Sequence, residues 1–277
     1  MKIYKTIVNK HFTTKTSALE VLVKISKQKE DLLIDAALKG AVWLQEKSKG
    51  KILRLRDLSV ILDPSDTISF FYDHRVLAIE TLEEGSCLFE NSHYGIWFKP
   101  AGIITQGTQA GDHSSLMRYI EKTKNRQIYL VHRLDRETAG LILFSYHQES
   151  AKYFSKLFSE NKVKKVYHAI VMGQTPESGK INFSLEDKEA LTFYKRLEAS
   201  HEHSLVEVEI KTGRLHQIRK HFDMIGHPVL GDPKYGKGNK NKDGLKLLAY
   251  GLEFRDPFDR QKKTFQSPFQ LSLKSIT

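Results

Sequence analysis

A short charged segment between two apolar runs constrains the fold of this chain most strongly. Residues 128–131 and 141–144 are rich in β-branched and aromatic side chains, a composition typical of buried strands. The segment between them carries Asp135, with Arg133 and Arg136 on either side. We therefore expect Asp135 at a turn between two core strands, where an unpaired buried carboxylate is costly and needs a partner.

The spacing of these charges leaves two interpretations of Asp135 open. A structural ion pair between aspartate and arginine at a strand end is common in proteins. A carboxylate held in place for chemistry is the alternative, and it predicts further functional residues elsewhere in the chain.

Composition indicates one large domain or two ordinary domains with a substantial core, since 40% of the 277 residues are hydrophobic. No apolar run approaches the roughly 18 residues that a membrane span requires. The N-terminus lacks the apolar segment of a signal peptide. A single cysteine, Cys87, excludes an intrachain disulfide and a cysteine-cluster zinc site. We expect a cytoplasmic protein that is not associated with a membrane.

The charge balance predicts a polyanionic partner, most simply nucleic acid, because 44 Lys and Arg face 33 Asp and Glu, a net charge of +11. A basic protein without such a partner is the alternative. Lysines cluster at 162–165 beside Tyr167 and again in a loop rich in Gly and Asn. That loop carries Lys234, Lys237, Lys240, Lys242 and Lys246. Such lysines can contact phosphates without reading sequence, or can simply be solvated.

Residues 1–85 predict a small α+β domain, followed by a linker at 80–86. Its expected elements are helices at 17–25 and 31–40 and strands at 41–45 and 66–72. This order resembles the alpha-L RNA-binding motif named after a ribosomal protein. The chain departs from that motif at Glu30-Asp31, where a basic pair is usual. The domain is therefore expected either to bind RNA or to be mainly structural.

Residues 86–277 predict a second domain in which short strands outnumber helices. Strands are expected at 163–172, 180–185, 190–198, 203–211 and 246–254, and helices at 114–122, 148–160 and 214–224. This pattern favours an α+β domain with a mixed, mostly antiparallel sheet over a doubly wound parallel sheet.

Residues from about Trp97 to Phe254 resemble the RluA-type RNA pseudouridine synthases. Any one of the shared motifs is weak, but five in this order are specific. The motifs are Lys99-Pro100-Ala101-Gly102, His132 to Gly140, Lys165 to Gly173, Thr212 to Arg219 and His227 to Gly236. The resemblance implies the pseudouridine synthase fold and the isomerisation of uridine in ribosomal or transfer RNA. It also implies a reaction that needs no cofactor and no metal.

The resemblance makes Asp135 the catalytic carboxylate, either as the nucleophile or as the base that initiates cleavage of the glycosidic bond. Arg214 maps onto the arginine that pairs with this aspartate. Phosphate binding at a helix start is its alternative role. Tyr167 maps onto the tyrosine that stacks on the target base and is a candidate for the late proton abstraction. Core packing is the alternative for Tyr167.

The resemblance also assigns residues that bind the RNA. Arg133 is expected to replace the target uridine in the RNA stack when that base is extruded. His132 is expected to be a hydrogen-bonded structural residue rather than an acid. The remaining expected contacts are Lys165 with phosphate, Leu247 in the apolar lining of the pocket, and Arg219 and Lys220 with phosphates.

Two positions depart from the family pattern. Ala139 stands where serine is usual, and Leu248 stands where histidine is usual. We expect activity to survive the first change, and local contacts of the pocket wall to differ at the second.

Two other classes of protein stay possible from the sequence. One is a catalytically silent RNA-binding protein or RNA chaperone on the same fold, and the other is a nuclease. The trio of Asp135, Tyr167 and Arg214 argues against the first. A nuclease needs a metal-binding carboxylate cluster or a histidine pair, and neither is evident. An alpha-L-like domain favours ribosomal over transfer RNA, and a monomer is expected because the RNA itself supplies a large surface.

Overall fold

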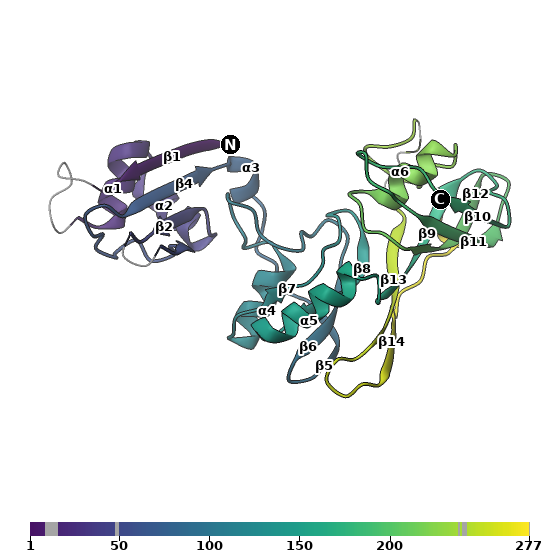
Figure 1. Ribbon diagram of the computed structural model, residues 1–277. Coiled ribbons are helices and arrows are strands. Elements are labelled where there is room, and N and C mark those ends of the chain that lie inside the picture. Colours follow the sequence, from purple (N-terminus) through teal and green to yellow (C-terminus); the bar gives the residue numbers. More distant parts are fainter. Residues whose placement is uncertain (9–15, 48–49, 238, 240–242, 277) are drawn as a thin grey trace. The chain divides into compact units, whose positions relative to one another are not determined.

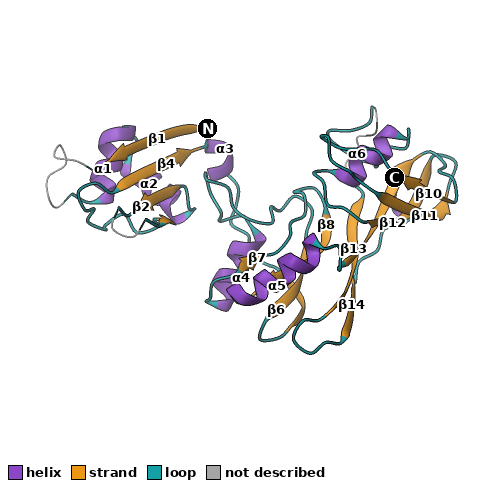
Figure 2. Cartoon of the chain, viewed as in Figure 1, coloured by secondary structure: helices purple, strands orange, loops and turns teal. Residues whose placement is uncertain are grey.

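The computed structural model describes residues 1–8, 16–47, 50–237, 239 and 243–276. Lys240 and Lys242 of the expected basic loop lie outside these residues. The chain forms two compact units, the first from residues 1–84 and 106–124 and the second from residues 85–105 and 125 onwards. Figures 1 and 2 show the helices and strands of each.

The first unit packs two helices against one face of an antiparallel sheet. The strand order is β1 (Lys2–Ile7), β4 (Thr67–Tyr72), β2 (Val42–Gln45) and β3 (Ile52–Arg54). The helices are α1 (Ala18–Ser26) and α2 (Glu30–Leu38), and a short α3 (His74–Leu77) follows β4. Ser17 and Glu20 form a capping box that starts α1. Leu22, Leu33 and Phe70 are fully buried in the core between helices and sheet.

Residues 106–124, which the sequence analysis placed in the second domain, belong to the first unit and end in α4 (Leu116–Lys124). Long-range polar contacts hold this segment. The Asp112 carboxylate lies 3.1 Å from Arg54 Nε and 2.6 Å from Arg56 Nη2, and the Trp43 indole donates to the Gln109 carbonyl at 2.9 Å. A buried carboxylate requires such partners, and both arginines come from the N-terminal part of the chain.

The second unit is built on a mixed sheet, as the alternation of short strands predicted. Its main strand order is β10 (Ser178–Ile181), β11 (Thr192–Ala199), β12 (His203–Ile210), β9 (Lys164–Met172), β13 (Leu247–Arg255), β8 (Ala139–Ser145), β6 (Tyr94–Lys99) and β5 (Ser86–Glu90). In addition, β14 (Lys262–Gln266) pairs with β13, and β7 (Tyr129–Leu130) pairs with β8. Within the described residues the pairings are antiparallel except for β8 with β13, which confirms the predicted α+β class.

The parallel contact between β8 and β13 depends on Gly140. Its φ of +124° is a conformation that other residues rarely adopt. A Cβ atom on Gly140 would lie 2.3 Å from the Ala249 carbonyl oxygen and 2.5 Å from the Ala249 nitrogen. Glycine therefore lets the two backbones approach closely enough to pair.

Two helices of the second unit complete its cores. In α5 (Gln148–Ser159), Phe154 packs against Tyr94 and Phe254. In α6 (Gln217–Met224), Phe222 packs in a second cluster with residues of β9 and β12, including Val206. A short 3-10 helix spans Leu273–Ser275. Over the described ranges, every helix is too short or too polar to cross a membrane.

Candidate active site

The loop between β7 and β8 carries Asp135 and is fixed from both sides. The hydroxyl of Thr105 accepts from the Leu134 nitrogen at 3.2 Å and donates to the Leu134 carbonyl at 2.9 Å. The Thr138 nitrogen donates to the Asp135 carbonyl at 3.2 Å and closes a turn around the aspartate. Asp135 thus lies at a turn between two core strands, as its sequence environment predicted.

The buried Lys99 side chain holds this loop through hydrogen bonds to its backbone. Its ammonium donates to the carbonyls of Pro100 at 3.0 Å, Ile103 at 2.7 Å and Arg136 at 3.1 Å. Two further hydrogen bonds join Gly102 and Arg136. The Gly102 nitrogen donates to the Arg136 carbonyl, and Arg136 Nε donates to the Gly102 carbonyl. The Lys99 to Gly102 motif therefore acts as a scaffold for the backbone on either side of Arg136.

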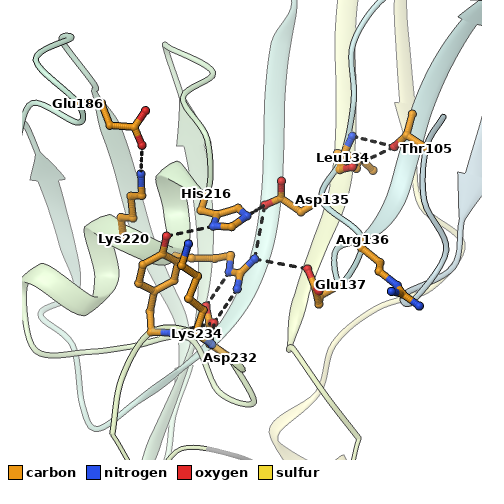
Figure 3. A network of polar contacts seen from close by, with 12 residues as sticks. Thr105, Leu134, Asp135, Arg136, Glu137, Glu186, His216, Lys220, Asp232 and Lys234 are labelled. Carbon is orange, nitrogen blue, oxygen red and sulfur yellow. Dashed lines mark hydrogen bonds and ion pairs between the residues drawn. The ribbon is translucent and has the colours of Figure 1, made fainter. Parts of the chain in front are cut away.

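The carboxylate of Asp135 faces two basic side chains at ion-pair distance. His216 Nε2 and Arg219 Nη1 each lie 3.8 Å from Asp135 Oδ2. Figure 3 shows the His216 ring turned toward Asp135. Neither distance is short enough for a hydrogen bond. Within the described part of the chain no side chain or backbone group donates to this carboxylate, and its side chain is 20% exposed. Its oxygens are therefore available to a substrate.

Arg219 is the buried cation of the site, and its predicted contact with phosphate is wrong. Its side chain is 2% exposed and makes a bidentate pair with Asp232, with both hydrogen bonds at 2.7 Å. Its remaining nitrogen, Nη1, lies 3.5 Å from Glu137 and 3.8 Å from Asp135 and has no hydrogen-bond partner. A phosphate cannot reach a guanidinium enclosed in this way.

Arg214 does not pair with Asp135, so this prediction is also wrong. The exposed Arg214 side chain donates from Nε to the Glu189 carbonyl at 3.0 Å, and its backbone nitrogen donates to the Gln217 side chain at 3.1 Å. The reason lies in the start of α6 at Gln217, three residues later than the sequence suggested. Arg214 lies in the preceding turn and lines the mouth of the pocket, whereas Arg219 points from the helix toward Asp135.

His216 is a pocket residue to which the sequence analysis assigned no role. Its backbone is left-handed, with a φ of 54°, and its Nδ1 lies 3.0 Å from the Tyr235 hydroxyl. Burial lowers the pKa of His216, although Asp135 opposes that shift. The ring is therefore mostly neutral near pH 7, which leaves Arg219 as the permanent positive charge near Asp135. The sequence motif around His216 was the signal that could have found it.

Tyr167, Leu247 and Arg133 line one small pocket together with Asp135. The pocket holds ≈ 100 Å³. Burial and then the charge of Asp135 raise the pKa of Tyr167, so its hydroxyl stays protonated in the resting site. Leu247 is buried and supplies an apolar wall, whereas the Arg133 side chain is exposed at the opening.

His132 and Lys220 do not face this pocket. His132 Nε2 accepts from the Leu143 nitrogen at 3.0 Å, and the ring stacks on Phe158 at 4.2 Å. Burial lowers the pKa of His132 to about 3, which fits the structural role that was expected rather than an acid or a substrate contact. Lys220 is paired with Glu186 at 2.7 Å, and Figure 3 shows this pair directed away from Asp135. The predicted phosphate contact of Lys220 would require breaking that pair.

Lys165 is 8% exposed, and its side chain has no hydrogen bond or ion pair within the described residues. Its position on β9 places it two residues before Tyr167, on the same face of the strand. The two departures from the family pattern, Ala139 and Leu248, are neighbours in the pairing of β8 with β13. Leu248 is 3% exposed and so packs as an apolar residue in the place of the usual histidine.

Comparisons with known proteins agree with this fold. The sequence profile of the RNA pseudouridylate synthase family matches residues 93–224. A tRNA pseudouridine synthase C from Haemophilus ducreyi is 33% identical over 61% of this chain and 84% of its own length. A ribosomal large subunit pseudouridine synthase D from Borreliella burgdorferi is 28% identical over 95% of this chain and 90% of its own length. Among solved structures, the human RNA pseudouridylate synthase domain containing 1 superposes with a TM-score of 0.58 at 23% identity, over 68% of this chain and 84% of that structure, which supports the fold.

The fold and these sequence matches define an RNA-modifying enzyme. The chain belongs to the RluA-type family of RNA pseudouridine synthases, because it matches the family profile and covers most of a relative that is 33% identical. Its activity is accordingly the isomerisation of uridine in RNA.

Proposed function

We propose that Asp135 is the catalytic carboxylate of this isomerase and that structured ribosomal RNA is its substrate. The observation that carries the first part is the state of the Asp135 carboxylate. It is held near Arg219 at 3.8 Å, is partly exposed in the pocket, and receives no hydrogen bond from the described residues. A carboxylate in this state can approach a ribose without first losing a partner.

The reaction exchanges one bond of the ribose C1′ atom for another. The bond from C1′ to the uracil nitrogen N1 breaks, the ring turns, and C1′ bonds to C5 of the same uracil. C5 then loses its proton, and N1 gains one. The sum is an isomerisation in which no atom enters or leaves. Asp135 starts this sequence either by attacking C1′ or by removing a proton from the ribose. Until that step Arg219 stabilises the negative charge of Asp135, and either step consumes this charge.

Tyr167 and Arg133 complete the proposed site. The raised pKa of Tyr167 opposes proton abstraction while Asp135 is negatively charged. An ester between Asp135 and the ribose would remove that charge, so Tyr167 is more easily ionised late in the reaction, and only the ionised form can act as the base. A pocket of ≈ 100 Å³ is below the roughly 300 Å³ typical of ligand sites. The pocket must therefore widen to admit a uracil. The exposed Arg133 side chain can move out of the pocket and occupy the place in the RNA stack that the uridine leaves.

The preference for ribosomal RNA rests on which relatives span the whole chain. The relative named for the ribosomal large subunit aligns over 95% of this chain, including the N-terminal unit, whereas the relative named for tRNA aligns over 61%. We propose that residues 1–85 form a degenerate alpha-L-like domain that contributes to RNA binding. A monomer acting in the cytoplasm completes the proposal.

The variant Asp135→Asn tests the assignment of the carboxylate. Asparagine keeps the shape but cannot act as nucleophile or base, so pseudouridine formation should fall below detection while RNA binding persists. The assay is carbodiimide mapping of ribosomal and transfer RNA from cells that lack the gene, incubated with either protein. Lys152→Glu, an exposed change on α5, is the matched control for protein quality. Full activity of Asp135→Asn would reject the role of Asp135, and a site that appears in transfer RNA alone would reject the proposed substrate.

A further inference from the structure

A second, larger cavity of ≈ 620 Å³ lies at the ends of strands β9, β12 and β13, and the start of β14 also lines it. Figure 1 labels these four strands. We call it the basic groove. Its volume is within the roughly 300–1,000 Å³ that ligand sites commonly have. Six exposed cationic side chains line it, namely Lys162, Lys164, Lys211, Arg255, Arg260 and Lys262.

The carboxylates in the groove do not balance these cations. Two acidic residues line it, Glu209 and Glu253, against six cations, so the described lining has a net charge of +4. Glu209 is shared by Lys164, at 3.6 Å, and Lys211, and Glu253 pairs with Lys262 at 2.8 Å. Each carboxylate is therefore already occupied by lysine, and Lys162 is paired at 2.7 Å with Glu160, which does not line the groove.

The two arginines of the groove are not matched by any acid among the described residues. Arg255 donates from Nε to the Arg260 carbonyl at 2.8 Å, which leaves the outer nitrogens of its guanidinium facing solvent. Arg260 is exposed at a turn with a φ of 59° and makes no described side-chain contact with a carboxylate. Guanidinium groups in this state suit bidentate contacts with phosphate oxygens.

Lys165 adds an unmatched charge beside the groove. It pairs through its backbone with Ile210 and Leu252, one on each neighbouring strand, and it is more than nine-tenths buried without a described partner. Burial and then the charge of Lys211 lower the pKa of Lys165. The second of these causes is repulsion by a cation of the groove, which an anion bound there would relieve.

The groove offers charge but no surface on which a base could stack. Its aromatic lining residue within the described chain, Phe254, is 2% exposed and belongs to the core. Single-stranded RNA is bound through its bases where aromatic side chains are exposed, and through its backbone where cations line a groove. The chemistry here therefore favours the sugar–phosphate backbone over bases.

The groove and the pocket that holds Asp135 are neighbours along β12. Ile210 lines both, and Lys211 of the groove is followed by Thr212, Gly213 and the pocket residue Arg214. An RNA strand whose target base lies beside Asp135 therefore meets the groove as it continues past Ile210.

We propose that the basic groove binds consecutive phosphates of the RNA strand that flanks the target uridine. This inference rests on the proposed function, because it assigns the groove to the same substrate. It gives the groove a role in affinity and in register, not in the chemical step, since no groove side chain touches the reacting atoms.

The test uses the full chain and the double variant Lys211→Glu/Arg260→Glu. Binding of a short labelled oligouridylate RNA is measured by fluorescence anisotropy between about 50 and about 200 mM salt. Loss of phosphate contacts should lower the slope of log affinity against log salt by roughly 0.7 per contact for a single strand, so by roughly 1.4 for the pair. The variant should also raise KM for the RNA at unchanged kcat, since uniform binding is lost.

The matched control is Lys152→Glu/Lys180→Glu, which makes the same change of charge at two exposed positions outside the groove. A neutral pair, Lys211→Gln/Arg260→Gln, guards against repulsion effects of the introduced acids. Equal salt slopes and affinities for the groove and control variants would overturn the inference. The proposed function is tested separately, by whether the wild-type protein forms pseudouridine. The salt slope is measured on binding alone, so its outcome does not depend on that activity.

Discussion

Replacing Arg219 by methionine should damage both the stability and the activity of this enzyme, for two separable reasons. Arg219 joins two carboxylates that lie on different elements. It pairs bidentately with the fully buried Asp232 at 2.7 Å, and it lies 3.8 Å from the catalytic candidate Asp135. Methionine fills similar space and removes the charge from both contacts.

The cost in stability comes from the Asp232 carboxylate that is left behind. Breaking a buried ion pair on one side costs about 3–5 kcal/mol. The lower value applies here, because Asp232 also accepts from the backbone nitrogens of Lys234 at 2.8 Å and Tyr235 at 3.0 Å. A loss of about 3 kcal/mol corresponds to a decrease in Tm of roughly 6–12 °C for a unit of this size.

The cost in activity comes from the second contact. Opposite charges 3.8 Å apart attract by about 4 kcal/mol at an effective dielectric constant near 20, before desolvation is subtracted. Because Asp135 gives up its charge as it reacts, this attraction acts on the resting carboxylate, where it keeps Asp135 in position. A misplaced reacting group costs up to roughly 100-fold in rate, so kcat should fall by roughly 10-fold to 100-fold. Single-turnover pseudouridine formation with saturating RNA measures this loss directly.

The double variant Arg219→Met/Asp232→Asn separates the two effects. Asparagine removes the orphaned charge and still accepts the two backbone hydrogen bonds, so most of the lost Tm should return. Activity should stay low, because Asp135 still lacks its cation. Recovery of both Tm and kcat in the double variant would refute the reasoning, since Arg219 would then matter only as the partner of Asp232.

Three further predictions concern other parts of the site. Arg214→Ala should raise KM for RNA several-fold with a smaller change in kcat, measured by steady-state kinetics, because Arg214 lines the pocket without contacting Asp135. A loss confined to kcat would contradict this. Gly140→Ala should lower the free energy of unfolding in urea by about 3 kcal/mol or more, since its Cβ would clash with Ala249 at 2.3 Å; Gly213→Ala, with open space around it, is the control. Burial lowers the pKa of Lys99 to about 7, against the pull of Glu137 and Asp135. Between pH 7 and 10.5 the unfolded chain then binds more protons at Lys99 than the folded chain. The free energy of unfolding should therefore rise with pH across that window, by at most roughly 5 kcal/mol. In Lys99→Met, urea unfolding at several pH values should show a smaller rise.

The parts of the fold that follow from local pattern were predictable from the sequence. Apolar runs on both sides of Asp135 gave β7 and β8, and the alternation along 163–172 gave β9 with Lys165 and Tyr167 on one face. These features depend on residues that are close in the sequence, so they can be predicted without knowing how the rest of the chain folds.

The partner of Asp135 could not be predicted in this way, because it depends on where α6 begins. The side chain of Gln217 accepts from the backbone of Arg214 and from the hydroxyl of Thr212, and the left-handed His216 precedes the helix. A start that is three residues later turns a different arginine toward the site. The segment 106–124 was misplaced for a related reason, since its ion pair with Arg54 spans the chain and leaves no local signature.

The assembly of the site from distant segments has a consequence for the order of folding. Asp135 and Arg219 are 84 positions apart, and Asp232, which holds Arg219, comes later still. Contacts of such separation form late, because long loops must close before they contribute. During synthesis the aspartate loop therefore leaves the ribosome well before the helix that completes its surroundings. A nascent or truncated chain should display the loop and yet be inert toward RNA, and activity in a refolding experiment should return after the circular-dichroism signal of the sheet.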